Sequence, residues 1–415
     1  MATTERPGHP SSTTRRPSLL ALALVTGIGP FATDTYLAAL PQVREALATS
    51  STGAQLTITG FIVGLAVGQL VAGPVSDGRG RRGVVVLSAT AFTLVSLLCA
   101  LAPSAPLLVL LRVLQGLVAG AGVAVGRAVV SDSHEGPAAA KAFGTLAAIT
   151  LLAPVVAPAV GGLVLEVADW RAVFGLMAAL GALMLGAALV GVPETLPREH
   201  RQRGGVRALG ARVSDLAHDR AFVHPVAVQC LATAGFFVYI GGSSIVLQGA
   251  LGISSGTYSL VFATNAAAMA LTSLVFRLTV VRLGARALRR AGLLLSTAGA
   301  LVLLVTAAAA AQGGGSAALG AVWPLLTVVV AGMGFTLPAS TVLAQEAGRR
   351  SAGTASSLLG GSGFLVGAAV TPLTGVVGDE TVLAMAALMV PGFVAATAVA
   401  LTGGPLRRGA RCEST

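Results

Sequence analysis

The stretch GPVSDGRGRRG, residues 73–83, places one acidic residue and three arginines between apolar runs that cover residues 55–75 and 84–102. Neither run carries a charged side chain. A short basic segment between two apolar segments long enough to cross a bilayer has to lie at a membrane surface. Its positive charge favours the cytoplasmic surface. Residues 73–83 therefore predict a polytopic membrane protein and indicate the direction of the flanking segments.

Composition supports the same class. Hydrophobic residues make up 54% of the 415 and charged residues 10%, whereas a soluble domain is about a quarter charged. The net charge of +11 comes from short arginine clusters between apolar runs, so we expect no nucleic-acid partner. Cys99, Cys230 and Cys412 lack metal-ligand spacing and the histidines form no cluster, so neither a metal site nor a cofactor is predicted.

Apolar runs of membrane-spanning length recur along the whole chain. They are continuous rather than alternating, which favours helices over a closed barrel. The predicted fold class is an all-α membrane protein with twelve transmembrane helices in two six-helix halves. The predicted spans are 18–40, 55–75, 84–102, 106–127, 141–165, 171–192, 222–248, 256–277, 287–311, 317–343, 351–377 and 380–402.

The longest polar connection, residues 193–221, carries six arginines and divides the chain into halves. We expect two related halves packed around a central pathway. The sequence VVRLGARALRR, residues 280–290, occupies the place in the second half that GPVSDGRGRRG has in the first, but it lacks the acid. The predicted units are a disordered cytoplasmic tail 1–17, the halves 18–192 and 222–402, the cytoplasmic connector 193–221 and a cytoplasmic tail 403–415.

Twelve crossings place both termini on one side of the membrane. With that side cytoplasmic, 24 of the 27 basic residues lie there, Arg44 and Arg171 lie outside, and Arg112 lies within the membrane. This distribution follows the positive-inside rule. Arginine- and alanine-rich usage with a single lysine indicates a bacterial source, so we expect a bacterial inner membrane with both termini cytoplasmic.

Two ionisable residues stand out within the apolar runs. Asp34 is about six residues before the outer end of the first run, and Arg112 is about six residues after the outer start of the fourth, so both lie roughly 9 Å below the outer surface. A charge within the membrane is costly and is usually retained for function. We interpret Asp34 as a group that binds and releases protons, with Arg112 as its partner. The alternative is that both are partly hydrated and only hold helices together.

Two runs also carry small or helix-breaking residues. Gln115 follows Arg112 by one turn, in a glycine-rich run that favours close helix packing. In the fifth run Pro154 and Pro158 each remove a backbone donor, and Gly161 and Gly162 follow them. Such a segment is typical of a bent helix that lines a cavity, although packing alone is an alternative. A phosphate-binding GxxxxGK[ST] motif is absent from the sequence, so no ATPase is predicted.

These motifs resemble the major facilitator superfamily, and within it the drug:proton antiporters of the Bcr/CflA type. The resemblance covers residues 18–402 and includes RVLQG, RAVVSD, APAVGG, TDTYLAALP, WRAVF and PETL. Ala157 and Ala38 stand where glycine and proline are usual. The motif residues at the 73–83 loop and at the end of the fourth run are Gly73, Asp77, Gly80, Arg81, Arg82, Arg127 and Asp132.

The resemblance implies a monomeric rocker-switch exporter in which Arg112 takes part in proton coupling and Asp34 in proton or substrate recognition. It also implies that Asp77, with Arg81 and Asp132, latches the halves in an outward-open state near residues 351–357. The alternative is a solvated turn that only sets orientation. Expected cavity residues, chosen as aromatic or polar groups in helices that line the pathway, are Tyr36, Phe61, Gln115, Phe236, Phe237 and Tyr239.

The predicted function is proton-coupled export of small amphiphilic compounds such as phenicols. An alternative on the same fold is export of one endogenous metabolite or of a self-made antibiotic, and a proton-independent uniporter is another. A membrane enzyme would need a nucleophile and base or a metal cluster, and the sequence contains no such set. The expected partners are the substrate, protons and the lipid bilayer.

Overall fold

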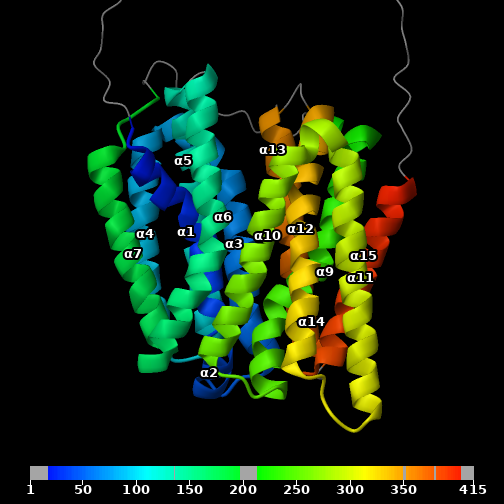
Figure 1. Cartoon of the computed structure of the whole chain (residues 1–415). Coiled ribbons are helices and arrows are strands. Elements are labelled where there is room, and N and C mark those ends of the chain that lie inside the picture. Colours follow the sequence, from blue (N-terminus) through cyan, green and yellow to red (C-terminus); the bar gives the residue numbers. More distant parts are fainter. Residues whose placement is uncertain (1–16, 135, 197–212, 349–351, 378–379, 403–415) are drawn as a thin grey trace, which may run out of the picture.

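A computed structural model describes residues 17–134, 136–196, 213–348, 352–377 and 380–402, which form a bundle of long helices (Figure 1). The first half contains α1 Leu19–Leu37, α3 Ser51–Arg79, α4 Arg81–Ala100, α5 Ala105–Ser133, α6 Gly136–Val167 and α7 Trp170–Gly191. The second half contains α9 Arg220–Ala250, α10 Ser255–Leu283, α11 Ala285–Gln312, α12 Leu319–Ala347, α13 Ala352–Val370 and α15 Val382–Thr402. Two short helices are α2 Leu40–Ala46 and α14 Leu373–Val377.

Each of the twelve predicted spans overlaps one of these long helices, so the predicted fold class is confirmed. The helices extend past the apolar runs, and α3 continues through the polar loop as far as Arg79. The predicted span 351–377 is broken between α13 and α14 by Pro372, because proline lacks the N–H that would continue the helix. The predicted tails and most of the connector lie outside the described residues.

The protein is a multi-pass membrane protein. Within the described ranges eleven helices are long and apolar enough to cross a membrane, and the described part of α6, Leu152–Val167, is a shorter apolar helix. Large apolar side chains cover the outside of the bundle, such as Leu87 at 68% exposure and Val281 at 92%. Such an apolar surface is unfavourable in water but is compatible with the hydrocarbon tails of lipids.

The two halves repeat one another at the turn between their second and third long helices. Gly80 joins α3 to α4 with φ 101° and ψ 154°, and Gly284 joins α10 to α11 with φ 80° and ψ 145°. Glycine reaches this positive-φ region without steric cost. The matching geometry supports the sequence echo between residues 73–83 and 280–290.

The halves meet where α6 packs against α10 and where α3 packs against α13 (Figure 1). We call the end of the bundle at which α1 begins and α15 finishes the terminal end, and the opposite end the α2 end. This arrangement places α1, α3, α9 and α10 around the centre of the bundle, where the candidate site lies.

Candidate functional site

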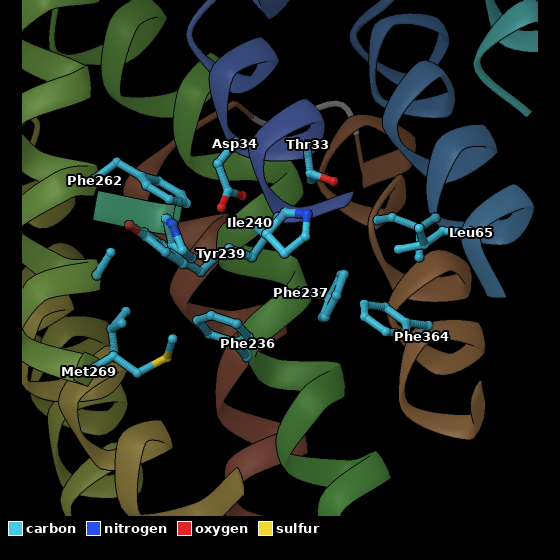
Figure 2. Close-up of a pocket in the computed structure, with 15 residues that line it drawn as sticks. Thr33, Asp34, Leu65, Phe236, Phe237, Tyr239, Ile240, Phe262, Met269 and Phe364 are labelled. Atoms are coloured by element: carbon cyan, nitrogen blue, oxygen red, sulfur yellow. The ribbon is translucent and has the colours of Figure 1, made fainter. Parts of the chain in front are cut away.

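A cavity of about 150 Å³ lies between the two halves (Figure 2). Both halves contribute to its wall, because α1, α3 and α6 face α9, α10, α12 and α13 across it. Aromatic and aliphatic side chains make up most of the lining. The lining residues are Pro30, Thr33, Asp34, Ile62, Leu65, Pro154, Phe236, Phe237, Tyr239, Ile240, Phe262, Ala266, Met269, Val330 and Phe364.

Asp34 brings a carboxylate into this apolar wall. Its side chain points into the cavity on the side of Tyr239 and Phe262 (Figure 2). Asp34 is 7% exposed, and it has no hydrogen bond or ion pair with any other described residue. A buried carboxylate without a partner is costly in its charged form, so a proton or a polar ligand group would stabilise it.

The wall opposite α1 is an aromatic cluster. The rings of Tyr239 and Phe262 are stacked, with centroids 5.7 Å apart and an interplanar angle of 11°. Phe237 meets Phe236 and Phe364 edge to face. These faces offer a flat, weakly polar surface to a ligand.

Behind this wall, Asn265 fixes the hydroxyl end of Tyr239. The Asn265 amide donates to the Tyr239 hydroxyl at 3.1 Å and accepts from the Thr327 hydroxyl at 2.6 Å. Sequence reasoning missed Asn265, Phe262 and Phe364. Asn265 could have been found, because it is a lone amide in the apolar run 256–277. Nothing in the sequence distinguishes Phe262 and Phe364 from phenylalanines that face lipid.

Arg112 lies in a separate cluster inside the first half. The guanidinium is fully buried and lies over the rings of Phe61, Tyr36 and Phe174, at 4.3, 4.7 and 5.6 Å from their centroids. It donates to Gln115 Oε1 at 2.6 Å, and Gln115 in turn donates to the Ser96 hydroxyl. Ring faces and oxygen acceptors thus stand in for a carboxylate around this cation.

Helix α1 separates Arg112 from Asp34. Arg112 makes long hydrogen bonds to the carbonyls of Ala32 on α1, at 3.5 Å, and Thr57 on α3, at 3.4 Å. It therefore reaches the level of Asp34, as their matched depth in the sequence predicts. Residues 32 and 36 share one face of α1 and residue 34 lies on the opposite face, because successive helical residues turn by 100°. Asp34 and Arg112 therefore form no direct ion pair in this conformation, and their joint part in proton coupling stays a prediction.

The six predicted cavity residues divide between these two places. Phe236, Phe237 and Tyr239 line the cavity. Tyr36, Phe61 and Gln115 do not line it in this conformation, because they surround Arg112.

Helix α6 lines the cavity and packs against helices of both halves. Pro154 lines the cavity and Pro158 is buried. A Cβ at Gly161 would collide with the backbone of Thr35 on α1, and one at Gly162 with the side chain of Ser259 on α10. These two glycines therefore let α6 pack closely against its own half and against the other half.

The loop of residues 73–83 is held by Arg81. Arg81 donates through Nε to Asp132 at 2.9 Å and forms an ion pair with Asp77 at 2.6 Å. Its backbone N–H donates to Glu194, and Thr195 donates to Asp132. All of these partners belong to the first half or to the start of the connector that follows it.

The other motif residues of this region form no hydrogen bond or ion pair with a described residue of the second half. Arg82 donates to the carbonyl of Leu189, and Gly80 supplies the turn described above. Gly73 has open space beside it, and Arg127 is exposed without an ion pair to a described residue. The predicted contact of Asp77 with residues 351–357 lies partly outside the described residues.

At the α2 end, polar groups join the two halves. Arg44 forms an ion pair with Glu380 at 2.7 Å, and Ser51 hydrogen-bonds to the same carboxylate. Gln55 donates to Thr374 at 2.6 Å and accepts from the backbone of Gly375. At the terminal end no hydrogen bond or ion pair joins the halves within the described ranges. The bundle is therefore fastened at its α2 end.

Comparison with known proteins agrees with this architecture. The family model described as Major Facilitator Superfamily matches residues 22–372. The chain is 32% identical over 376 residues to "Uncharacterized MFS-type transporter YdgK" of Bacillus subtilis (strain 168), covering 89% of this chain and 92% of the relative.

Two further relatives carry names of resistance proteins. "Bicyclomycin resistance protein homolog" of Haemophilus influenzae is 26% identical over 357 residues, covering 84% of this chain and 86% of the relative. "Multidrug resistance protein MdtL" of Salmonella heidelberg is 31% identical over 248 residues, covering 60% of this chain and 62% of the relative.

Solved structures share the fold at low identity. An inward-facing, occupied bacterial homolog of the human lysosomal transporter Spinster has a TM-score of 0.73 and 16% identity, covering 92% of this chain and 95% of that one. A D-xylose-proton symporter has a TM-score of 0.70 and 16% identity, covering 92% and 96%.

Proposed function

The chain belongs to the Major Facilitator Superfamily, a family of transporters rather than enzymes, and on that premise we propose that it exports small amphiphilic compounds in exchange for protons. Within the superfamily we assign it to the drug:proton antiporters of the Bcr/CflA type. The relatives named for bicyclomycin and multidrug resistance support this assignment, as do the motifs that begin with TDTYLAALP.

The observation that carries the proposal is the unpartnered Asp34 carboxylate in an aromatic cavity between the halves. Flat apolar compounds bind favourably against Tyr239, Phe262 and Phe237, and one polar group of the compound satisfies Asp34. A cavity of about 150 Å³ accepts a benzene-sized group, so a larger compound requires the halves to move apart.

Coupling follows if proton and substrate compete for Asp34. A proton keeps the carboxylate neutral when the cavity is empty, and substrate binding displaces that proton. The proton is released on the side of the membrane from which the substrate binds, and the substrate is then released on the opposite side. Arg112 contributes by holding α1 from its opposite face through Ala32 and Tyr36, so its part in coupling is indirect.

The direction of transport rests on the orientation of the bundle. We assign the terminal end to the cytoplasm, because the arginine-rich segments gather there. The α2 end then faces outward, and the fastened α2 end corresponds to an inward-facing state. The proposed location is the inner membrane of a bacterium, with both termini cytoplasmic.

The test is the resistance profile of a host that lacks its own efflux pumps. Expression is expected to raise the tolerated concentration of several unrelated amphiphilic antibiotics, phenicols included, and a protonophore is expected to abolish the gain. Protection against one compound alone would favour the alternative, an exporter of a single endogenous metabolite or self-made antibiotic. Efflux that resists the protonophore would favour a uniporter.

A further inference from the structure

A second cavity, of about 680 Å³, lies at the terminal end of the second half. The starts of α9 and α11 and the ends of α12 and α15 enclose it. Four arginines line it, together with one histidine, one carboxylate and several aliphatic side chains. The charged and titratable lining residues are Arg220, His224, Arg286, Arg289, Arg290 and Glu346.

Arg289 is the central group of this cavity. It is 4% exposed, and its Nε and one terminal nitrogen are buried without a hydrogen-bond partner. No described carboxylate lies within 4.0 Å of it. An unpaired buried cation with unused donors is unfavourable, because it has lost water and gained no acceptor in return. The charges of Arg286 and Arg290 on the same helix add repulsion.

In the first half, acidic residues neutralise the arginine at the matching turn. There Arg81 is paired with Asp77 and Asp132. By the match of Gly80 with Gly284, position 77 corresponds to Val281, so the second half lacks that acid. By the same match Arg81 corresponds to Ala285 and Arg82 to Arg286, so Arg289 and Arg290 are additions of the second half that have no acidic partner among the described residues.

The remaining residues that line the cavity do not supply an acidic partner for Arg289. Glu346 forms no ion pair with a described residue, and His224 donates to the carbonyl of Val399 at 3.1 Å. Helix α11 begins here without a side-chain cap and without an acidic residue in its first turn. Its first N–H groups and its dipole also favour an anion at this end. Val223, Leu343 and Ala400 make part of the wall apolar.

We propose that this cavity binds a phosphate group carried by an anionic ligand. Guanidinium groups match phosphate oxygens in pairs, so Arg289 with Arg286 and Arg290 provides the donors and charge that a phosphodiester needs. Basic pockets between transmembrane helices bind acidic lipid headgroups, and the apolar part of the wall suits an acyl chain. The same chemistry accepts inorganic phosphate or a soluble phosphate ester. This site is independent of the proposed efflux function.

Native mass spectrometry of the purified full-length protein tests the proposal by counting retained phosphatidylglycerol after titration, with phosphatidylcholine for comparison. We expect saturable retention of phosphatidylglycerol. Arg289→Gln is expected to weaken it about tenfold or more, because a charge-assisted contact is lost. Arg286→Gln combined with Arg290→Gln tests the site without altering the buried residue. Arg282→Gln is the matched control, since Arg282 is exposed near the same turn and does not line the cavity.

A parallel titration with inorganic phosphate, in detergent without lipid, separates the two sources. Arginine-dependent retention of phosphatidylglycerol identifies a lipid headgroup site. Arginine-dependent thermal stabilisation by phosphate, with no preference for phosphatidylglycerol, identifies a site for soluble phosphates. If neither probe binds, or if Arg282→Gln weakens binding as much as Arg289→Gln does, the proposal is overturned.

Discussion

Arg44 and Glu380 lie 336 positions apart in the sequence, and their side chains form an ion pair of 2.7 Å across the boundary between the two halves. Arg44 follows α1 in the first half, whereas Glu380 precedes α15 in the second. Ser51 and Gln55 add hydrogen bonds to the second half beside this pair. A transporter that alternates between two states has to break these contacts each time the α2 end opens.

Neutralising either partner is therefore expected to favour the state that is open at the α2 end. The pair is about one-third exposed, so its loss should change the equilibrium between states by a factor of roughly five. Distances between spin labels placed on the two halves at this end, measured for Glu380→Gln and Arg44→Gln, report that shift. Exchange of the charges, Arg44→Glu with Glu380→Arg, should restore the original distribution.

The matched control is Arg171→Gln, which removes the longer 4.0 Å pair with Asp169 within one half. It should leave the label distances unchanged. Equal distance distributions in the wild type and in Glu380→Gln would show that the remaining hydrogen bonds alone close this end.

The course of the twelve helices could be predicted from the sequence, because spanning segments have to be long and apolar and bilayer thickness sets their length. The pairing of Arg44 with Glu380 could not. Sequence order placed Arg44 in an outer connection and Glu380 at the start of the last apolar run. Which outer side chains meet depends on how the halves tilt, and no local pattern encodes that tilt.

Asp34→Asn is expected to uncouple transport from protons. The amide cannot bind and release a proton, so addition of substrate should cause no proton release from proteoliposomes that hold this variant. The affinity for substrate should fall less than the proton release does, because the aromatic wall of the cavity is intact. Asp34→Glu should keep proton release, and Thr33→Ala, a change at the neighbouring cavity residue, serves as the control. Undiminished proton release from Asp34→Asn would remove Asp34 from the mechanism.

Arg112→Lys is expected to destabilise the first half although it keeps the charge. An ammonium is a compact charge and cannot both donate to Gln115 and lie flat against the rings of Phe61 and Tyr36. The expected loss in unfolding free energy is about 1–3 kcal/mol. Chemical denaturation in detergent measures it, and Arg79→Lys, at an exposed arginine, should be silent. A stability equal to wild type would mean that charge alone matters at this position.

The candidate site was only partly predictable for a physical reason. An ionisable residue in an apolar run is conspicuous, so Asp34 and Arg112 stood out, and helix rise gave their common depth. Which side of α1 each one faces depends on packing. Asn265 shows the same limit: its amide is visible in the sequence, but its bond to Tyr239 exists only because α9 and α10 are neighbours.

Asp77 and Asp132 are expected to differ in their effects, although both pair with Arg81. Asp132 accepts from Arg81 and from Thr195, so Asp132→Asn should loosen the end of α5 and lower thermal stability. Asp77 has an exposed side chain and an ion pair with Arg81 four residues later, which is worth about 0.5 kcal/mol or less. Asp77→Asn should therefore leave thermal stability near wild type. It should reduce the transport rate if Asp77 also forms the predicted latch between the halves in the outward-open state. Transport at the wild-type rate would leave the loop with a topological role alone.

Gly116→Ala is expected to disrupt the contact between α3 and α5. A Cβ at Gly116 would collide with the carbonyl of Phe61, whose ring covers Arg112, so backbone would have to shift. Forcing extra volume into a close-packed contact costs about 1–3 kcal/mol. Gly186→Ala is the matched control, because a Cβ there meets open space and alanine is the better helix former. With Cys230 and Cys412 replaced by serine, a thiol-reactive dye that reaches buried Cys99 only on unfolding measures both melting temperatures. The melting temperature should fall for Gly116→Ala and hold or rise for Gly186→Ala; equal values would show that α3 and α5 separate without cost.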